Sequence, residues 1–294
     1  MSPMAEMLTH FPEIADGASE SRLKGVRFFK ETKHVPREPM VYDPGIYIVA
    51  QGYKIACLGG LKFRYDTDHY LVTSVAMPLE CEIFASPEEP LRGMVIDIDM
   101  PQLHDLIGQL GLQADIRAAG EKGLPCGIGP AVMDEDMAHA AARLVKCLRS
   151  EAETRILGPG LVREILYRAL CGAQASVLYS LAMHSGAFSQ VAHALKVLQN
   201  HYAEKIDVEQ LAGAARMSAS AFHRAFKEIT SDSPIQYLKK IRLTKARDLM
   251  LQEGLKAYLA ADRVGYESSS QFSREFKRYF GQSPADMVRE SRSA

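Results

Sequence analysis

The sequence lacks the features that mark membrane, secreted and disulfide-stabilised proteins. It has no tryptophan and only five cysteines among 294 residues. Its apolar stretch 70–79 is interrupted by Thr73 and Ser74, so it contains no run of the roughly 18 apolar residues that a membrane helix needs. No basic segment followed by an apolar one stands at the N-terminus, so we expect a cytoplasmic protein without a membrane partner. Because they are odd in number and include no Cys-x-x-Cys motif, the cysteines are predicted to be reduced core thiols: Cys57, Cys81, Cys126, Cys147 and Cys171.

Patterns typical of enzymes are missing as well. The nine histidines form neither a His-x-His nor a His-Glu-x-x-His motif. His69 is the only histidine in the strand-rich region, and His34 lies upstream of it. His69 is more typical of a turn residue than of a metal ligand. The chain has no Gly-x-Ser-x-Gly motif, and Gly127-Ile128-Gly129-Pro130 lacks the third glycine of a nucleotide-binding loop. We therefore expect no catalytic residue, no metal and no cofactor.

Length and charge indicate two unlike halves. A chain of 294 residues is long enough for about two domains, and its 47% hydrophobic and 24% charged residues are typical of globular proteins. The net charge of −1 divides into +5 from Gln190 onward and −6 before it. A basic segment joined to an acidic one suggests a polyanionic partner for the basic half.

The first half is predicted to be a small β-barrel or sandwich followed by helices. Between 45 and 100, short β-rich runs alternate with turns, and Gly59-Gly60 is a hairpin signal. Apolar stripes then predict helices over 103–110, over 134–148 and from Pro159 to Ala169. These stripes either cover the barrel or form a dimer face, and the sequence leaves both open.

The second half contains an internal repeat. At an offset of 50 residues eight positions are identical. They are Ser218, Ser220, Phe222, Arg224, Phe226, Lys227 and Ser233-Pro234 in the first copy, and Ser268, Ser270, Phe272, Arg274, Phe276, Lys277 and Ser283-Pro284 in the second. Such agreement at one spacing indicates two copies of one supersecondary unit.

Each copy has the pattern of a helix-turn-helix. The paired phenylalanines stand four residues apart and so share one helical face, while the Arg and Lys project elsewhere. A shorter helix precedes each basic one, capped by Asp207 in the first copy and ended by the Gly265 turn in the second. Two helices, a tight turn and a basic second helix predict a DNA-binding unit.

A longer helix from Pro234 to about Met250 is predicted to separate the two units. At 1.5 Å per residue it spans roughly 25 Å, so two basic helices held by it could reach major-groove segments about 34 Å apart. The basic residues along this helix either bind phosphates or form a solvated charged face: Lys239, Lys240, Arg242, Lys245 and Arg247.

The second copy resembles the signature of the AraC/XylS family of transcriptional regulators. The resemblance rests on Gly265-Tyr266-Glu267-Ser268, on 272–277 and on Phe280-Gly281-Gln282-Ser283-Pro284. It extends from near Val191 to Arg289 and implies seven helices with two helix-turn-helix units in one chain. A shorter match in the first half, through Asp43-Pro44, 51–54 and 70–78, implies a cupin-like effector domain.

The family resemblance also implies which residues read DNA. The positions that match base-facing residues are Ser220, Ala221, His223 and Arg224 in the first unit, and Ser269, Ser270, Gln271, Ser273 and Arg274 in the second. Arginine can pair with guanine and glutamine with adenine. We favour base contact over phosphate contact for Arg224 and Arg274, whereas Lys227 and Lys277, one turn further on, are predicted to contact phosphate.

One departure from the family pattern lies in the first helix of the second unit. Ala257, Ala260 and Ala261 stand where larger aliphatic residues are usual. The unit is then either packed more loosely or filled by Tyr258 and Leu259 from a shifted face.

The sequence thus predicts an α+β protein with two domains. Residues 1–180 form a cupin-like β-barrel with helices, and residues 190–294 form an all-α domain with two helix-turn-helix units. A linker near 180–190, which contains Ser185-Gly186, joins them. We expect a regulator that binds double-stranded DNA, responds to a small-molecule effector, forms a homodimer and contacts RNA polymerase. The alternative is a ligand-independent regulator whose barrel serves only dimerisation, and a DNA-associated enzyme is a third possibility. The sequence does not identify the effector-binding residues.

Overall fold

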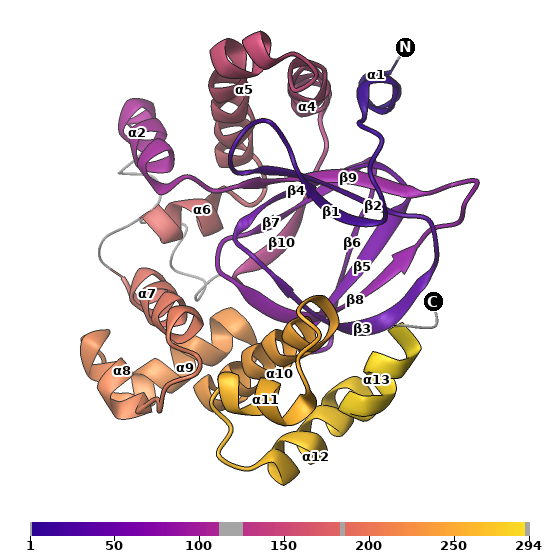
Figure 1. Cartoon of the computed structure of the whole chain (residues 1–294). Coiled ribbons are helices and arrows are strands. Elements are labelled where there is room, and N and C mark those ends of the chain that lie inside the picture. The colour runs from indigo at the N-terminus through magenta and orange to yellow at the C-terminus, as the bar shows by residue number, and fades with distance from the viewer. Residues whose placement is uncertain (1, 112–125, 183–185, 292–294) are drawn as a thin grey trace.

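The structure is a computed structural model that describes residues 2–111, 126–182 and 186–291. Its N-terminal half is a two-sheet β-structure with helices against one side, and its C-terminal half is a group of helices below the sheets (Figure 1). The predicted α+β class is confirmed.

Two antiparallel sheets build the N-terminal half. The six-stranded sheet runs in the order β1 (Gly17–Glu20), β2 (Val26–Glu31), β9 (Leu91–Asp97), β4 (Gly45–Gln51), β7 (His69–Thr73), β10 (Ile128–Val132). The four-stranded sheet runs β3 (Val35–Tyr42), β8 (Met77–Phe84), β5 (Tyr53–Leu58), β6 (Leu61–Tyr65). No hydrogen-bonded ladder joins the two sheets within the described ranges, so the predicted cupin-like barrel is present as an open sandwich.

The predicted hairpin at Gly59-Gly60 joins β5 to β6. Leu58 pairs with Leu61, and the two glycines have φ angles of 54° and 91°. A two-residue turn with positive φ at both positions matches the twist of the flanking strands, and glycine adopts it without steric cost. The turn therefore follows directly from the local sequence.

Helices cover one face of the six-stranded sheet. They are α1 (Pro3–His10), α2 (Met100–Leu110), α4 (Glu135–Cys147), α5 (Glu151–Cys171) and α6 (Ala175–Ala182). The predicted stripes of α2 and α4 pack into one buried cluster with strand residues such as Ile46 and Ile48. For these two helices the covering interpretation is therefore right, because the stripes are already occupied.

Helix α5 begins earlier than the sequence predicts. Its N-cap is Ser150, whose hydroxyl accepts a hydrogen bond from the Glu153 amide at 3.3 Å, and Pro159 lies inside the helix rather than at its start. Proline removes one helical hydrogen bond, to the carbonyl of Arg155. Arg155 is exposed, so solvent can satisfy that carbonyl.

Seven helices form the described C-terminal half, the number implied by the family resemblance. They are α7 (Ala187–Asn200), α8 (Val208–Ala214), α9 (Ala219–Thr230), α10 (Pro234–Gln252), α11 (Ala257–Arg263), α12 (Ser269–Phe280) and α13 (Pro284–Ser291). Ser185 of the predicted linker lies outside the described residues. Within the predicted linker, residues 180–182 belong to α6 and 187–190 to α7, so both ends of this segment are helical.

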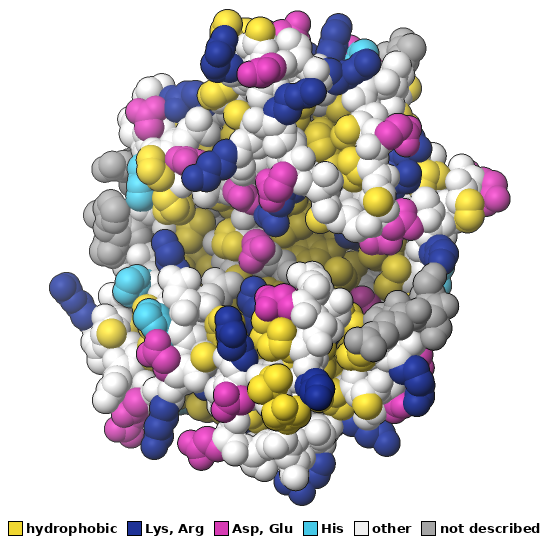
Figure 2. All heavy atoms as spheres, viewed as in Figure 1, with side chains coloured by type: hydrophobic (Ala, Val, Ile, Leu, Met, Phe, Trp, Pro, Cys, Tyr) yellow, Lys and Arg dark blue, Asp and Glu magenta, His cyan; other side chains and the backbone are white. Residues whose placement is uncertain are grey.

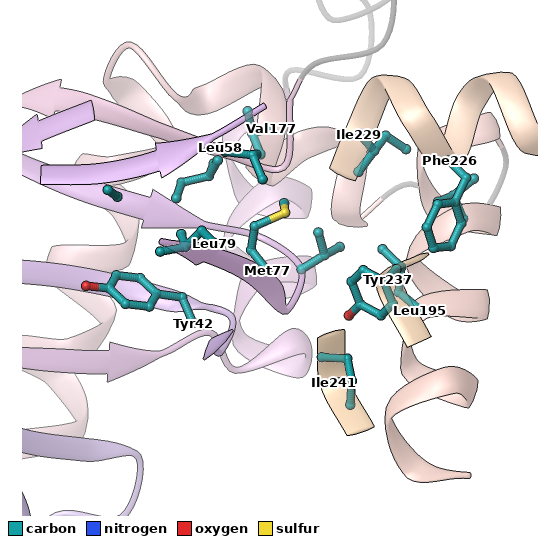
Figure 3. Packing of buried hydrophobic residues seen from close by; sticks show 14 of the residues in the cluster. Tyr42, Leu58, Met77, Leu79, Val177, Leu195, Phe226, Ile229, Tyr237 and Ile241 are labelled. Atoms are coloured by element: carbon teal, nitrogen blue, oxygen red, sulfur yellow. The ribbon is translucent and has the colours of Figure 1, made fainter. Parts of the chain in front are cut away.

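The two halves share one hydrophobic cluster. Met77 and Leu79 of the sandwich lie in the same buried core as Phe226 and Ile229 of α9 and Tyr237 of α10 (Figure 3). This packing stabilises the contact between the halves, because burial of apolar area contributes about 25 cal/mol per Å².

Directed hydrogen bonds reinforce this packing. The Tyr237 hydroxyl donates to the carbonyl of Ala76 at 3.0 Å, and the Gly127 amide donates to the carbonyl of Ile229 at 3.1 Å. At the same junction the Gly59 turn approaches Ser231 so closely that an added Cβ would lie 2.6 Å from the Ser231 Cβ. The β5–β6 hairpin thus abuts the turn that connects α9 to α10.

A second attachment lies further along α10. The Arg247 guanidinium donates a hydrogen bond to the carbonyl of Pro39 in β3 at 2.9 Å and lies 3.9 Å from the Glu38 carboxylate. Its other face lies over the Phe280 ring of α12, at 5.3 Å from the ring centroid. Both ends of α10 are therefore fastened to the sandwich.

The Tyr237 hydrogen bond gives a stability prediction. Replacing Tyr237 with Phe keeps the ring and leaves the buried Ala76 carbonyl without its donor, so we expect the free energy of unfolding to fall by about 1 to 3 kcal/mol. Urea denaturation followed by circular dichroism measures this. The matched control is Tyr258→Phe, because the Tyr258 side chain is 56% exposed and should change the midpoint little. Equal midpoints for the two variants would show that the hydroxyl contributes nothing to the attachment.

Candidate nucleic-acid interface

The repeat found in the sequence is a repeat in the structure. Helices α9 and α12 both contain 12 residues and start 50 positions apart. The side chains of Phe222 and Phe226 are fully buried, as are those of Phe272 and Phe276. Their ring centroids are 5.6 Å apart in the first unit and 5.4 Å in the second. The predicted phenylalanine faces are therefore confirmed as the core of each unit.

The same side chains begin and end both basic helices. Ser218 and Ser268 are the N-caps, and each hydroxyl accepts a hydrogen bond at 3.3 Å from the amide three residues on. Each helix ends in a left-handed residue, Ser231 in the first unit and Gly281 in the second. The N-caps satisfy amides that a helix leaves unpaired at its start.

The turns inside the two units differ in residue but share a conformation. Gly265 directly follows the C-cap of α11 and has a φ of 85°. Arg216 directly follows the C-cap of α8 and has a φ of 52°, so these turn residues correspond at an offset of 49 rather than 50. Glycine is required in the second unit because a Cβ there would lie 2.1 Å from the carbonyl oxygen of Ala203. The turn of the second unit thus packs directly against the loop that precedes the first.

The predicted DNA-contacting residues lie on the outer side of both helices. Arg224 and Arg274 are exposed, and within the described residues neither side chain has a hydrogen bond or an ion pair. The other exposed positions are Ser220, His223, Lys227, Ser269, Ser270, Gln271, Ser273 and Lys277, while Ala221 is half-buried. Their contact with DNA stays a prediction.

Two of these side chains are already engaged within α12. The Ser273 hydroxyl donates to the carbonyl of Ser269 at 2.9 Å, and the Gln271 side-chain amide donates to the Glu275 carboxylate at 3.2 Å. Gln271 keeps its second amide hydrogen and its amide oxygen for a base, although the bond to Glu275 fixes how its side chain is oriented. Among the described residues no such bond restrains Arg274.

Glu275 organises the surroundings of α12, although the sequence analysis did not identify it. Its carboxylate accepts hydrogen bonds from the Lys239 ammonium at 2.8 Å, from the Tyr266 hydroxyl at 2.9 Å and from Gln271. Burial raises the pKa of this carboxyl, but the three hydrogen bonds outweigh it and the pKa is lowered. The network ties α12 to α10 across the second unit.

The basic residues of α10 are mostly structural. Lys240 pairs with Asp232 at 2.7 Å, and the Arg242 guanidinium donates to the carbonyls of Tyr202, Glu204 and Gly265. With Lys239 and Arg247 paired as described, only Lys245 of the five remains as an exposed cation without a partner in the described chain. The other four have partners within the chain and do not form a solvated face, while their binding of phosphates stays a prediction.

The alanines of α11 face its core. Ala260 and Ala261 are buried in a cluster with Met250 of α10, whereas the Tyr258 and Leu259 side chains are 56% and 44% exposed. Filling of the core by Tyr258 and Leu259 is therefore wrong.

Other predicted sites can be located within the described residues. No group of three metal-ligating side chains is found there, and no helix in those ranges is long and apolar enough to span a bilayer. All five cysteines are free; Cys57, Cys81 and Cys147 are buried as predicted, but Cys171 is exposed. The His69 ring lies 3.2 Å from the Asp66 carboxylate beside a turn.

Comparison with known families identifies both halves. A model described as the AraC-type transcriptional regulator N-terminus matches residues 22–177, and a helix-turn-helix domain model matches residues 211–290.

Curated relatives are similar over part of their length. The transcriptional activator RhaS of Klebsiella pneumoniae is 31% identical over 161 residues, which cover 54% of this chain and 55% of the relative. RhaS of Citrobacter koseri is 33% identical over 134 residues, covering 45% and 47%. The chain thus matches about half the length of these relatives.

The fold as a whole is similar to that of ToxT from Vibrio cholerae. The crystal structure of ToxT with a bound unsaturated fatty acid has a TM-score of 0.60 to this chain, at 12% identity, and covers 95% of this chain and 97% of ToxT. The apo crystal structure of a ToxT variant gives a TM-score of 0.58 at 10% identity, covering 92% of this chain and 98% of that one. The likeness extends over both halves.

The lowered pKa of Glu275 makes the second unit sensitive to acid. Because this carboxyl binds its proton less readily in the folded state, stability is lost as the pH falls below about 4.5, where the unfolded chain takes up the proton first. We expect Glu275→Gln to cost about 1 to 3 kcal/mol at pH 7 and progressively less at lower pH. Urea denaturation at several pH values measures the difference. Glu267→Gln, which alters an exposed carboxyl of the same unit, is the control, and a difference independent of pH would contradict this role.

Proposed function

Since the chain belongs to the family of AraC-type transcriptional regulators, we propose that it binds specific double-stranded DNA sites and regulates transcription under the control of a small molecule held by its N-terminal half. In this proposal residues 1–180 form the effector-binding and dimerisation domain and residues 190–294 the DNA-binding domain. The protein acts in the cytoplasm without enzymatic activity and contacts RNA polymerase from its operator.

One observation carries the DNA-binding role. Arg224 and Arg274 occupy equivalent positions of α9 and α12, opposite the buried phenylalanine faces, and both are exposed without internal partners in the described chain. Helix α10, with 19 residues, is about 28 Å long and lies between the two units. A separation of that order suits helices that enter neighbouring major-groove segments about 34 Å apart.

The charges of this surface support base contact by the arginines. Four of the five basic residues on α10 are engaged in internal hydrogen bonds or ion pairs, whereas Arg224 and Lys227 of α9 and Arg274 and Lys277 of α12 are exposed. Arginine pairs bidentately with guanine, and lysine binds phosphate as a point charge. Lys227 and Lys277 therefore set the register on the backbone.

Control by an effector is supported by the junction between the halves. Ile229 and Tyr237 pack into the same core as Met77 and Val75 of the sandwich, so a ligand that shifts these strands also shifts α9. A ligand can change DNA affinity only through different affinities for two arrangements of the halves. ToxT, whose fold is similar, has been crystallised with an unsaturated fatty acid, which makes a small organic ligand a reasonable effector class here.

Dimerisation is proposed to use the outer face of α5. The Ile156 side chain is 72% exposed, Leu157 52% and Tyr167 41%, in contrast to the buried stripe of α4. Large apolar side chains grouped on one exposed helix mark an interaction surface.

The DNA proposal is tested on Arg274. Loss of a bidentate base contact costs about 1 to 3 kcal/mol, so Arg274→Ala should weaken binding to the cognate site about 5- to 150-fold and binding to a scrambled site much less. Lys277→Ala should weaken both alike and reduce the salt dependence. Fluorescence anisotropy with the two duplexes at several salt concentrations separates these outcomes.

The control for Arg274 is Lys146→Ala, an exposed lysine on α4 far along the chain from either unit, which should leave both affinities unchanged. Equal losses on cognate and scrambled DNA for Arg274→Ala would remove its base-reading role.

The dimer face is tested on Ile156. An aspartate there places a charge in the apolar contact, so we expect Ile156→Asp to raise the dimer dissociation constant at least tenfold. Sedimentation equilibrium measures it, with Val132→Asp as the control because Val132 is similarly exposed, at 66%, on β10. If each of the two variants remains dimeric, or if the unchanged protein is monomeric, the proposed dimer interface on α5 is refuted.

A further inference from the structure

Gln271 lies near the start of α12, on the side of the helix that faces away from the core of its unit. It is the third residue of the helix and is exposed, three positions before Arg274, so the two side chains are neighbours on the helix surface. Phe272 and Phe276 point the other way, into the buried core. In a helix-turn-helix, the first residues of the second helix contact base edges in the major groove. A side chain at this position can therefore read a base.

Charge on its own does not select a base at this surface. In the view of Figure 2, the Lys and Arg side chains over the C-terminal helices are interspersed with Asp and Glu. Cations attract the phosphates, which are the same in every sequence. Selection of one base over another depends on hydrogen bonds of defined direction, such as those that the Gln271 amide can make.

Glu275 stands one helical turn after Gln271, but its carboxylate is turned toward α10, with 13% of the side chain exposed. One carboxylate oxygen accepts hydrogen bonds from the Lys239 ammonium at 2.8 Å and from the Gln271 amide at 3.2 Å. The other oxygen accepts one from the Tyr266 hydroxyl at 2.9 Å. Three of its roughly four acceptor positions are thus occupied, so Glu275 is poorly placed to contact a base itself. Any contribution it makes to base recognition passes through Gln271.

The direction of the bond between Gln271 and Glu275 is fixed by chemistry. Burial raises the pKa of the Glu275 carboxyl, but its hydrogen bonds outweigh burial and the pKa is lowered, so the group is ionised at neutral pH. An ionised carboxylate has no hydrogen to donate, and the amide must therefore turn its nitrogen toward it. A solvated amide can exchange its two ends by rotation, whereas this one is held one way round. One N–H and the oxygen of Gln271 remain available.

The groups that remain available match adenine. In the major groove adenine presents the acceptor N7 beside the N6 amino donor, whereas guanine presents two acceptors, N7 and O6. Since one N–H of Gln271 is engaged by Glu275, the amide has a single donor left. Facing guanine, its oxygen would meet a second acceptor, but facing adenine both its donor and its oxygen find partners.

Two other elements keep Glu275 in place. Lys239 belongs to α10, and Tyr266 lies in the turn before α12, where its ring packs edge-on against that of Phe272 with centroids 5.3 Å apart. The Gln271 amide is therefore oriented before DNA arrives. A side chain that is already in its bound orientation loses less conformational freedom on binding.

We propose that Glu275 is a positioning residue for base recognition, because it holds the Gln271 amide in the orientation that selects adenine over guanine in the major groove facing α12. Lys239 and Tyr266 support it by fixing the carboxylate. This inference rests on the proposed DNA binding, of which it names one determinant of specificity.

The experiment selects binding sites from randomised duplexes with the full-length protein and then measures affinities by fluorescence anisotropy. The base pair read by Gln271 is the one at which Gln271→Ala loses its preference. There we expect the unchanged protein to bind adenine about tenfold more tightly than guanine. Glu275→Met keeps the side-chain length but removes the acceptor, and it should lower this ratio by about threefold or more. Glu267→Met, which alters an exposed carboxyl of the same unit, is the control and should leave the ratio unchanged.

The ratio separates positioning from a purely structural role. Partial unfolding of Glu275→Met lowers the affinity for both duplexes alike and leaves their ratio as it was. Preferences at the other selected base pairs should also stay unchanged. With Gln271→Ala and Glu275→Met together, the ratio should equal that of Gln271→Ala alone, because Glu275 acts only through Gln271.

A ratio that stays unchanged in Glu275→Met, with or without an equal loss of affinity for all four bases, means that Glu275 is structural and overturns the inference. So does a further change of the ratio in the double variant. If the protein selects specific sites but Gln271→Ala selects the same sequence, only this inference is refuted. If the protein selects no sequence at all, the DNA-binding proposal is refuted together with it.

Discussion

The contact of α9 and α10 with the end of the sandwich is the constraint on which the rest of the structure depends. Ile229 and Tyr237 belong both to the core of the first helix-turn-helix and to the core that contains Met77. The Ile229 carbonyl accepts a hydrogen bond from the Gly127 amide, and the Tyr237 hydroxyl donates one to the Ala76 carbonyl. Neither half can complete its packing alone. The position of the first DNA-binding helix is therefore set by the sandwich as well as by its own unit.

The second unit is held by charge more than by shared core. Arg247 bridges α10, β3 and the Phe280 ring, while Glu275 gathers Lys239 and Tyr266. Partly buried ion pairs with several hydrogen bonds specify geometry even where their net contribution to stability is modest. The two units are thus joined to the N-terminal half in different ways, the first through apolar packing and the second through the hydrogen bond of Arg247 to β3.

Local patterns made most of the fold predictable. The repeat at a fixed offset, the phenylalanine pairs and the capping serines predicted α9 and α12, and Gly59-Gly60 predicted its hairpin, because each depends on neighbours in the sequence. The start of α5 was missed because Pro159 usually opens a helix. Lys54 is buried, and Arg242 and Glu275 are hydrogen-bonded within the fold, because of residues far along the chain. The periodicity of the sequence does not reveal such contacts, and charged residue types on their own suggest exposed side chains.

The turns at Arg216 and Gly265 make the two copies non-interchangeable. The first copy tolerates a side chain in its left-handed residue because that position is exposed, whereas the second has the Ala203 carbonyl against it. Duplication supplied two similar modules, but this close approach means that a chimera carrying the first module twice would collide with its own preceding loop. The turn of the leading copy therefore admits residues with side chains, whereas the trailing copy admits only the smallest amino acid.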